Sequence, residues 1–235
     1  MYNILICDDD KDIVSALEIY LKSEGYQTFP AYNGTEALDV VEREDIHLVL
    51  MDVMMPGMDG LRATAKLREE HNVPIILLTA KSEDSDKVLG LNIGADDYVT
   101  KPFNPIEVMA RVKSQLRRYT ALGGRTQTEP KDNDVLINGG IVLNDKTKLV
   151  TVDGEERSLT PLEYSILKLL MSHPGQVFST SQIYERVWND PSYGSENTVA
   201  VHIRHLREKV EIDPGNPRYI KVVWGLGYKM ERMVK

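Results

Sequence analysis

Residues 1–14 read MYNILICDDDKDIV, an apolar run that ends in three adjacent aspartates and continues into a helical pattern. A short apolar run followed by a helical pattern recurs throughout the first half of the chain. We predict strands at residues 2–7, 26–31, 46–51, 73–78 and 97–100, and helices near residues 11–24, 34–43, 59–70, 83–93 and 105–119. This alternation predicts an α/β domain with a doubly wound, five-stranded parallel sheet covered by helices on both faces.

Like charges crowd at the end of the first strand, where Asp8, Asp9 and Asp10 are adjacent. Two unit charges ~4 Å apart repel by roughly 1 kcal/mol in water and about 4 kcal/mol near a protein surface, so something has to offset the repulsion. Asp52 follows another predicted strand and reaches the same sheet edge, and three carboxylates there suit Mg²⁺. For Asp10 and Asp12 we favour a role at the start of the next helix, whose first N–H groups need acceptors.

Two further strands bring different chemistry to this edge. Thr79 follows the strand at 73–78, and Lys101 follows the strand at 97–100. An acyl phosphate on Asp52 would require a divalent cation, a hydroxyl and an ammonium around it, because these groups neutralise or hydrogen-bond the phosphoryl oxygens. A Thr or a Lys after a strand is usually structural, but their arrival at successive strand ends favours the phosphoryl site.

Composition limits the remaining possibilities. The chain has 235 residues, a net charge of −8 and one cysteine, Cys7, which indicates two domains without a disulfide framework. Residues 1–122 hold 13 Lys and Arg against 21 Asp and Glu, whereas residues 196–235 hold 8 against 5, so a local basic surface remains near the C-terminus. The sequence carries no leader or membrane-span pattern, and we expect a cytoplasmic protein that does not contact membranes.

The pattern changes after a polar, glycine-containing stretch at residues 120–134, which we interpret as a linker between a first domain at 1–119 and a second at 135–235. Short strand-like pieces precede helices near residues 161–172, 179–188 and 196–211, and the chain closes on a hairpin. These elements predict a small α+β domain.

The helix at 196–211 has an apolar stripe that should face the domain core, formed by Val199, Ile203, Leu206 and Val210. Its opposite side carries Asn197, Val201, Arg204, His205 and Glu208. A solvated face would not favour Val201, whereas a helix in a DNA major groove could place it against a thymine methyl group. Periodicity alone leaves a solvated face and a DNA-reading face equally open.

Four segments, ILICDDD, VLMDVMMPGMDG, LLTAK and DDYVTKPF, together resemble the receiver domain of two-component response regulators, over about residues 1–119. The resemblance implies that Asp52 accepts a phosphoryl group from a sensor histidine kinase. It also implies the surrounding roles: Asp8, Asp9, Asp52 and the backbone carbonyl of Met54 for Mg²⁺, Thr79 and Lys101 for the phosphoryl group, and Thr79 with Tyr98 as the switch. The family usually has Glu where Asp10 stands.

The helix at 105–119 carries Glu107, Arg111 and Arg118 on one stripe. A Glu107–Arg111 pair within the helix is one explanation, but opposite charges also lie on neighbouring elements. Similarity to receivers of the OmpR/PhoB class implies a homodimer on phosphorylation, with cross-dimer pairs Lys87–Glu107, Asp97–Arg111 and Asp96–Arg118.

The second half resembles the winged-helix DNA-binding domain of the same class, in the segments SLTPLEYSILKLLMSHPGQVFS, NTVAVHIRHLREKVE and IKVVWGLGYK. The match implies phosphate contacts by Thr198, His202, Arg204 and Arg207 and base contacts by Asn197, Val201 and His205. Trp224 stands in the wing where the class often has Arg, and either a sugar–phosphate contact or a place in the core is open to it. The segments SQLRRY and VVWGLGYK are similar to regulators of the vancomycin-resistance type.

These resemblances imply a transcriptional regulator that is phosphorylated on Asp52, dimerises and binds tandem promoter half-sites, with RNA polymerase as a further partner. We expect no enzyme activity beyond Mg²⁺-dependent self-phosphorylation and autodephosphorylation. An Mg²⁺-dependent phosphohydrolase is disfavoured because its D-x-D-x-T motif would need Thr at Asp12. The alternative is a phosphorylation-independent DNA-binding protein whose receiver only dimerises.

Overall fold

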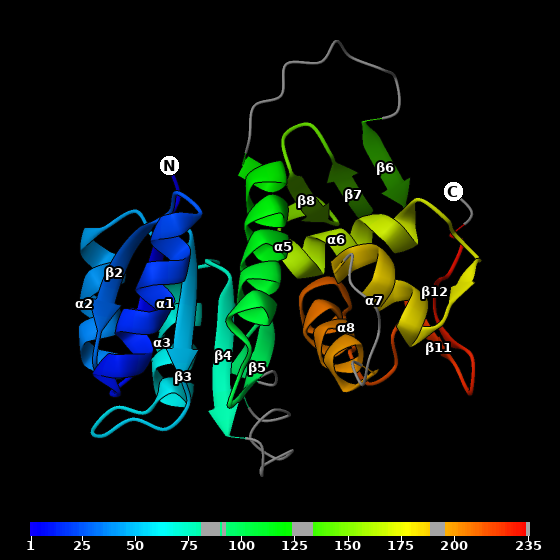
Figure 1. Cartoon of the computed structure of the whole chain (residues 1–235). Helices are drawn as coiled ribbons and strands as arrows, with labels where there is room; N and C mark the ends of the chain where they lie inside the picture. The colour runs from blue at the N-terminus through cyan, green and yellow to red at the C-terminus, as the bar shows by residue number, and fades with distance from the viewer. Residues whose placement is uncertain (81–89, 91–92, 124–133, 189–195, 234–235) are drawn as a thin grey trace. The chain divides into compact units, whose positions relative to one another are not determined.

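The computed structural model describes residues 1–80, 90, 93–123, 134–188 and 196–233 (Figure 1). The chain divides into two compact units, Met1–Tyr119 and Thr120–Lys235. Most of the predicted linker and nearly all of the predicted helix at 83–93 lie outside the described residues.

The first unit is built on a parallel five-stranded sheet, which confirms the predicted fold class. Its strand order is β2-β1-β3-β4-β5. β2 and β3 lie on opposite sides of β1, so the direction in which strands are added across the sheet reverses there. The strands are β1 (Asn3–Cys7), β2 (Gln27–Ala31), β3 (Leu48–Asp52), β4 (Ile75–Ala80) and β5 (Asp97–Lys101), and the described helices are α1 (Lys11–Ser23), α2 (Gly34–Arg43), α3 (Gly60–Glu70) and α5 (Pro105–Gly123).

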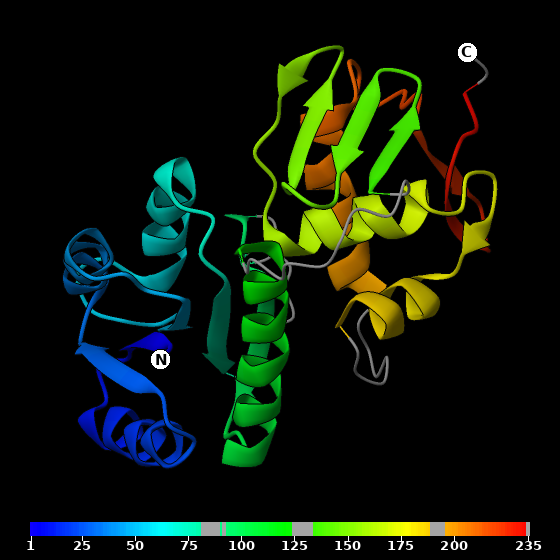
Figure 2. The same cartoon turned by 90° about the horizontal axis from the view of Figure 1, so that it is seen from above.

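Helices cover both faces of this sheet, and Figure 2 shows α2 and α3 on the side away from α1. Alternate strand residues face the two layers, because successive side chains of a strand point to opposite faces. Ile4 and Ile6 of β1 pack with α1 and α5, whereas Leu5 and Cys7 pack with α2 and α3. The inner strands β1, β3 and β4 are therefore buried on both faces, and their ends are the parts available for chemistry.

Aspartate and asparagine side chains begin the helices of this unit. The side chain of Asp10 accepts hydrogen bonds from the backbone N–H groups of Asp12 and Ile13 at the start of α1. Asn33 and Asp59 cap α2 and α3 in the same way. The prediction that Asp10 and Asp12 belong to the start of the helix is confirmed, and Asp8 and Asp9 remain for the sheet edge.

The second unit combines three helices with two antiparallel sheets, as expected for a small α+β domain. A four-stranded sheet has the order β6-β7-β8-β9 and a three-stranded sheet the order β10-β12-β11. The elements are β6 (Val135–Asn138), β7 (Ile141–Asn144), β8 (Leu149–Val152), β9 (Glu155–Glu156), α6 (Pro161–Met171), β10 (Val177–Phe178), α7 (Thr180–Trp188), α8 (Glu196–Val210), β11 (Ile220–Val223) and β12 (Gly227–Met230).

The apolar stripe of α8 confirms the predicted inward face. Val199, Ile203, Leu206 and Val210 are all buried in the core of this unit. Thr160 and Glu163 form a reciprocal capping box that begins α6, beside that core. Among the described helices of both units, none combines the length and the hydropathy needed to cross a membrane.

Asp145 joins the four-stranded sheet to α6 through a charged network. Its carboxylate accepts hydrogen bonds from Lys148 (2.7 Å), Tyr164 (2.8 Å) and Lys168 (2.7 Å). Burial by itself would raise the pKa of Asp145, but hydrogen bonds from these three side chains lower it to about 2. The network therefore stabilises the ionised carboxylate and the contact between the sheet and the helix.

We predict that Asp145→Asn lowers the free energy of unfolding of the second unit at pH 7 by about 1–3 kcal/mol, because charge-assisted hydrogen bonds are lost. Both tryptophans of the chain, Trp188 and Trp224, lie in this unit, so urea unfolding followed by tryptophan fluorescence measures the change. Glu155→Gln, at an exposed carboxylate with a single ion pair, is the control and should change stability by less than about 0.5 kcal/mol. Equal stability of Asp145→Asn and this control would contradict the assignment.

Candidate functional site

Four polar side chains meet at the carboxyl edge of the parallel sheet because the strand order brings their strands together. Asp8 follows β1, Asp52 ends β3, Thr79 lies near the end of β4 and Lys101 ends β5. The register places Asp52 opposite Leu78, next to Thr79. Ligands of open parallel sheets bind at this edge, beside the strand where the order reverses.

Three carboxylates form the acidic part of the site. Asp8, Asp9 and Asp52 each offer one oxygen, and these atoms lie within 4.8 Å of one another. Asp8 and Asp52 are buried, whereas Asp9 is exposed. A hard divalent cation prefers such oxygen ligands and keeps several waters, so the donor set fits Mg²⁺ with one side open to solvent.

Lys101 lies between the two buried carboxylates. Its Nζ is 2.7 Å from Asp8 Oδ2 and 2.8 Å from Asp52 Oδ1. Burial opposes the charge on Lys101, yet its hydrogen bonds to both aspartates leave the pKa of its ammonium raised. The ammonium therefore offsets the repulsion between the two aspartates.

Asp52 ionises less readily than an exposed aspartate. Burial raises the pKa of Asp52 to about 6, and the hydrogen bond from Lys101 only partly opposes this effect. The carboxylate is nevertheless ionised at neutral pH and above. A poorly solvated carboxylate next to a cation suits nucleophilic attack, because little hydration has to be removed.

The backbone beside Asp52 is held by a close approach that sequence reasoning did not identify. Gly60 begins α3, and a Cβ atom at this position would lie 1.9 Å from the backbone oxygen of Asp52. The N–H of Gly60 donates to the carbonyl of Val53 at 3.0 Å, which closes the loop that carries Met54. A glycine directly after an aspartate at a helix start was the available signal, since only glycine allows such contact.

Of the two predicted switch residues, Thr79 follows the register partner of Asp52, whereas Tyr98 lies three residues before Lys101 on β5. Thr79 is 2% exposed, and its hydroxyl is 3.5 Å from the carbonyl of Ala80. Tyr98, on β5, is partly buried against the core layer that includes α2 and α3. The Met54 side chain is exposed, so Met54 can offer the site only its backbone.

The charged face of α5 and β5 is paired within one chain. Arg111 Nη1 lies 3.0 and 2.9 Å from the two oxygens of Asp97, and Arg111 Nη2 lies 3.0 Å from Glu107. The intrahelical pair considered from the sequence is therefore present, and the Asp97–Arg111 pair forms without a partner chain. Lys87 and the Arg118 side chain lie outside the described residues.

The predicted cross-dimer role of Asp96 conflicts with its position. Asp96 is 1% exposed, its Oδ2 lies 2.6 Å from Arg68 Nη2, and the same oxygen accepts from the N–H of Ile75 at 2.8 Å. Arg68 also donates to the backbone oxygens of Gly94 and Val73. The carboxylate thus fastens α3 to the sheet, and in this conformation it does not face outward.

The predicted DNA-contacting side of α8 is only partly exposed. Thr198, Val201 and His202 are buried, at 2%, 8% and 2% exposure, and the His202 ring lies 5.5 Å from that of Trp188. Val201 lies on the predicted DNA-facing side by its helical angle but is buried in the free protein, and its base contact stays a prediction. The helical angle alone could not show this, because other segments of the same chain decide which side of a helix is covered.

Other α8 residues do face outward. Arg204 is exposed and pairs with Glu208 at 3.0 Å, and His205 is partly exposed. Ala200, one turn before Arg204, is partly exposed and was not among the predicted contacts, since alanine carries no chemical signal. The Asn197 side chain lies outside the described residues.

The wing residue Trp224 is 88% exposed, so the alternative that it fills the core is wrong. Arg207 points instead toward the base of the wing. Its Nε and Nη2 donate to the carbonyl oxygen of Ile220 at 3.1 and 2.7 Å. Burial also lowers the pKa of Arg207.

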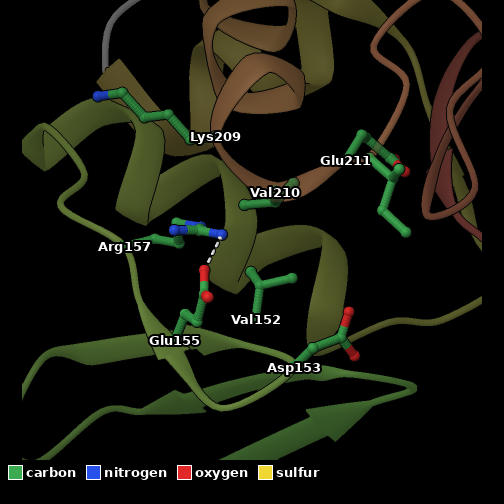
Figure 3. A pocket seen from close by; sticks show the side chains of 8 residues that line it. Val152, Asp153, Glu155, Arg157, Lys209, Val210 and Glu211 are labelled. Atoms are coloured by element: carbon green, nitrogen blue, oxygen red, sulfur yellow. Dashed lines mark hydrogen bonds and ion pairs between the residues drawn. The ribbon is translucent and has the colours of Figure 1, made fainter.

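A pocket of about 280 Å³ lies between the end of α8 and the β8–β9 turn (Figure 3). The side chains of Lys209, in the last turn of α8, and Glu211, directly after that helix, lie on different sides of it. Its two cationic side chains are already paired, Arg157 with Glu155 at 2.7 Å and Lys209 with Glu163 at 2.6 Å. We therefore assign no ligand to this pocket.

Comparisons with known proteins agree with the two-part architecture. Residues 4–113 match the response regulator receiver domain, and residues 154–230 match the C-terminal domain of transcriptional regulatory proteins. Regulatory protein VanR of Enterococcus faecium is 45% identical over 97% of this chain and 98% of its own length. Transcriptional regulatory protein YvrH of Bacillus subtilis is 42% identical over 97% of this chain and 94% of its own length.

Two solved structures match nearly the full length of the chain. DrrB, an OmpR/PhoB homolog from Thermotoga maritima, shares 32% identity at a TM-score of 0.50, and the match covers 98% of this chain and 99% of DrrB. A mutant of RitR matches with a TM-score of 0.75 and 24% sequence identity, and the match covers 99% of this chain and 100% of the RitR chain. At this identity the match supports a shared fold and nothing more.

We predict that Asp52→Asn stabilises the first unit at pH 8 in Mg²⁺-free buffer by about 2 kcal/mol, because a buried charge is removed. The folded pKa of Asp52 is about 6 and the unfolded value is near 4, so the cost of ionisation is absent below pH 4 and complete above pH 6. The stability gained by Asp52→Asn should decrease as the pH falls through this window. It should also decrease when Mg²⁺ is added, because Mg²⁺ stabilises the wild type.

Hydrogen exchange of β1 and β3 amides, followed by mass spectrometry, measures the stability of this unit separately. Asp39→Asn, at an exposed carboxylate of α2, is the matched control and should be neutral at both pH values. A pH-independent effect of Asp52→Asn would refute the assigned cost of ionisation.

Proposed function

Because the chain belongs to the two-component response regulators that join a receiver to an OmpR/PhoB-type DNA-binding domain, it is a phosphorylation-activated regulator of transcription, and we propose that Asp52 is its phosphoryl acceptor. A sensor histidine kinase donates the phosphoryl group, and promoter DNA is the target of the second unit. The observation that carries this proposal is the position of Lys101, within 2.8 Å of both Asp8 and Asp52.

The residues at the sheet edge would divide the work of phosphoryl transfer. Asp52, which is ionised above about pH 6, attacks the phosphorus with a carboxylate oxygen. The new O–P bond forms as the P–N bond to the phosphorylated histidine of the kinase breaks, and the imidazole of that histidine is the leaving group. Lys101 then neutralises a phosphoryl oxygen, and the Thr79 hydroxyl donates to another. Because Thr79 is buried, its reorientation toward the phosphoryl group would leave space into which Tyr98 turns.

Mg²⁺ would be held by the Asp8, Asp9 and Asp52 carboxylates and by the backbone carbonyl of Met54. When bound, it supplies positive charge to the phosphoryl oxygens during transfer. The fit rests on the three oxygens within 4.8 Å of one another, one of them on the exposed Asp9. Beyond phosphorylation and dephosphorylation of its own Asp52, we propose no enzymatic activity.

We further propose that phosphorylation favours a homodimer through the charged face of α5 and β5, and that the dimer binds tandem half-sites and contacts RNA polymerase. Arg111 and Asp97 already pair within the chain, so dimerisation would exchange this pair for one across the interface. An exchange of like pairs contributes orientation more than affinity, and phosphorylation therefore has to supply the bias.

Acetyl phosphate with Mg²⁺ should add one phosphoryl mass to the wild type and none to Asp52→Asn, measured by mass spectrometry of the intact chain. Lys101→Met should be labelled at least about tenfold more slowly, because an oxyanion-stabilising charge is lost.

Asp59→Asn is the control, since this carboxylate caps α3 outside the acidic site and Asn also caps helices. It should label at the wild-type rate. If the wild type gains no mass but binds DNA, the phosphorylation-independent alternative is correct.

Arg111→Gln should weaken acetyl phosphate-induced dimerisation by about tenfold, because the two Asp97–Arg111 pairs that orient the receivers across the two-fold interface are lost. Sedimentation velocity measures the dimer fraction with and without acetyl phosphate. Lys113→Gln is the matched control on α5, since Lys113 pairs with Glu24 at 2.7 Å, away from Asp97. Equal dimer affinity of both variants would argue against this interface.

A further inference from the structure

Two side chains near the end of α8 reach the same residue of the wing, which is the hairpin formed by β11 and β12. Arg207 and Glu211 are four positions apart, so they lie one helical turn from each other. Arg207 donates to the carbonyl oxygen of Ile220, and Glu211 accepts from the N–H of Ile220. Both backbone polar groups of the first residue of β11 are thus held by side chains of the same helical segment.

Glu211 is bound by consecutive backbone groups at this point. It is 8% exposed, and its carboxylate accepts from the N–H groups of Arg218 at 2.6 Å, Tyr219 at 2.8 Å and Ile220 at 2.7 Å. A buried carboxylate requires such donors, and charge-assisted bonds of this kind are the stronger class. The three N–H groups belong to consecutive residues, so they fix the direction in which the chain enters β11.

Arg207 completes the contact from the other side. Two of its N–H groups donate to the Ile220 carbonyl, and its guanidinium lies 5.8 Å from the ring centre of Tyr228 on β12. Tyr228 pairs with Val222 of β11, so Arg207 contacts both strands of the hairpin. Two N–H donors of Arg207 that could otherwise bind a DNA phosphate are therefore occupied within the protein.

The strand pairing explains why Ile220 is available to α8. β11 pairs with β12 alone in the three-stranded sheet, and Ile220 is the register partner of Met230. The neighbouring Tyr219 carbonyl accepts from Glu231 on the β12 side. In an antiparallel pair the direction of hydrogen bonding alternates, so the polar groups of Ile220 face the free edge, where Arg207 and Glu211 bind them.

We propose that Arg207 and Glu211 are positioning residues that hold the wing on the recognition helix, so that both reach DNA as one rigid unit. This inference rests on the proposed DNA-binding function and replaces the predicted phosphate contact of Arg207. The ligand of the positioned surface is duplex DNA, which α8 and the wing contact together. The wing turn is closed by the N–H of Leu226 on the carbonyl of Val223 at 2.9 Å, and it presents the exposed Trp224 at its tip.

The two tryptophans provide a direct readout of wing docking. Trp224 is 88% exposed and Trp188 is 1% exposed, so acrylamide quenches mainly Trp224 in the free protein. The experiment uses the full chain, phosphorylated with acetyl phosphate and Mg²⁺, and a duplex that the phosphorylated wild type has selected from a random pool. DNA should protect Trp224 of the wild type from acrylamide.

We expect Glu211→Gln and Arg207→Gln each to weaken DNA binding about tenfold and to leave Trp224 quenchable in the saturated complex. The double variant should bind DNA with about the affinity of the weaker-binding single variant, because both substitutions disrupt the same contact between α8 and β11. Arg207→Lys keeps the charge but not the planar fork, so it should also leave Trp224 quenchable, and it tests the inference if a glutamine variant does not fold. Glu156→Gln is the control at an exposed carboxylate of β9, outside α8 and the β11–β12 hairpin, and should keep Trp224 protected.

Two results would overturn the inference while leaving the proposed function intact. One is normal protection of Trp224 in Glu211→Gln and Arg207→Lys, combined with a salt dependence of Arg207→Gln that is lower by about one counterion, as a phosphate contact requires. The other is a wild-type complex in which DNA does not protect Trp224. A phosphorylated wild type that selects no duplex would instead refute the proposed function.

Discussion

Two buried carboxylates, Asp8 and Asp52, share the carboxyl edge of the first sheet, and the ammonium of Lys101 lies within 2.8 Å of both. Without a positive charge here, the edge would hold like charges in a poorly solvated place, at a cost of several kcal/mol. The ammonium reaches this point because β5 is two strands from β3 in a parallel sheet. The strand order therefore brings the positive charge of Lys101 to the acidic strand ends and offsets their repulsion.

The same arrangement explains why the first site was predictable from the sequence. Parallel strands end at one edge, so the strand pattern alone brings Asp8, Asp52, Thr79 and Lys101 together. Strand ends within two residues of the predicted ones were sufficient for this argument. Gly60 escaped it, because its close approach to the Asp52 carbonyl depends on how α3 begins rather than on any strand.

The second site was harder to predict because burial depends on partners distant in the sequence. The stripe of Val199 and Ile203 was correct, since a periodic apolar face has one plausible destination. Val201 is buried although its helical angle predicts exposure. The roles of Arg207 and Asp96 also depend on remote groups: the Ile220 carbonyl is 13 residues from Arg207, and Arg68 is 28 residues from Asp96. A charged residue read from sequence has no visible partner, so it is easily assigned to a ligand outside the chain.

The carboxylates of this protein differ in how completely their charge is compensated, and this difference separates structural from reactive groups. Asp145 accepts three hydrogen bonds from side chains and has its pKa lowered to about 2, and Glu211 is held by three consecutive backbone N–H groups. Burial and the two acidic neighbours Asp8 and Asp9 raise the pKa of Asp52, and the ammonium of Lys101 lowers it. The raising effects are larger, so the pKa of Asp52 is about 6. A carboxylate that the fold leaves under-compensated gains most from a new cation, because added positive charge lowers the cost of its ionised form. The incomplete compensation of Asp52 therefore favours cation binding at this sheet edge.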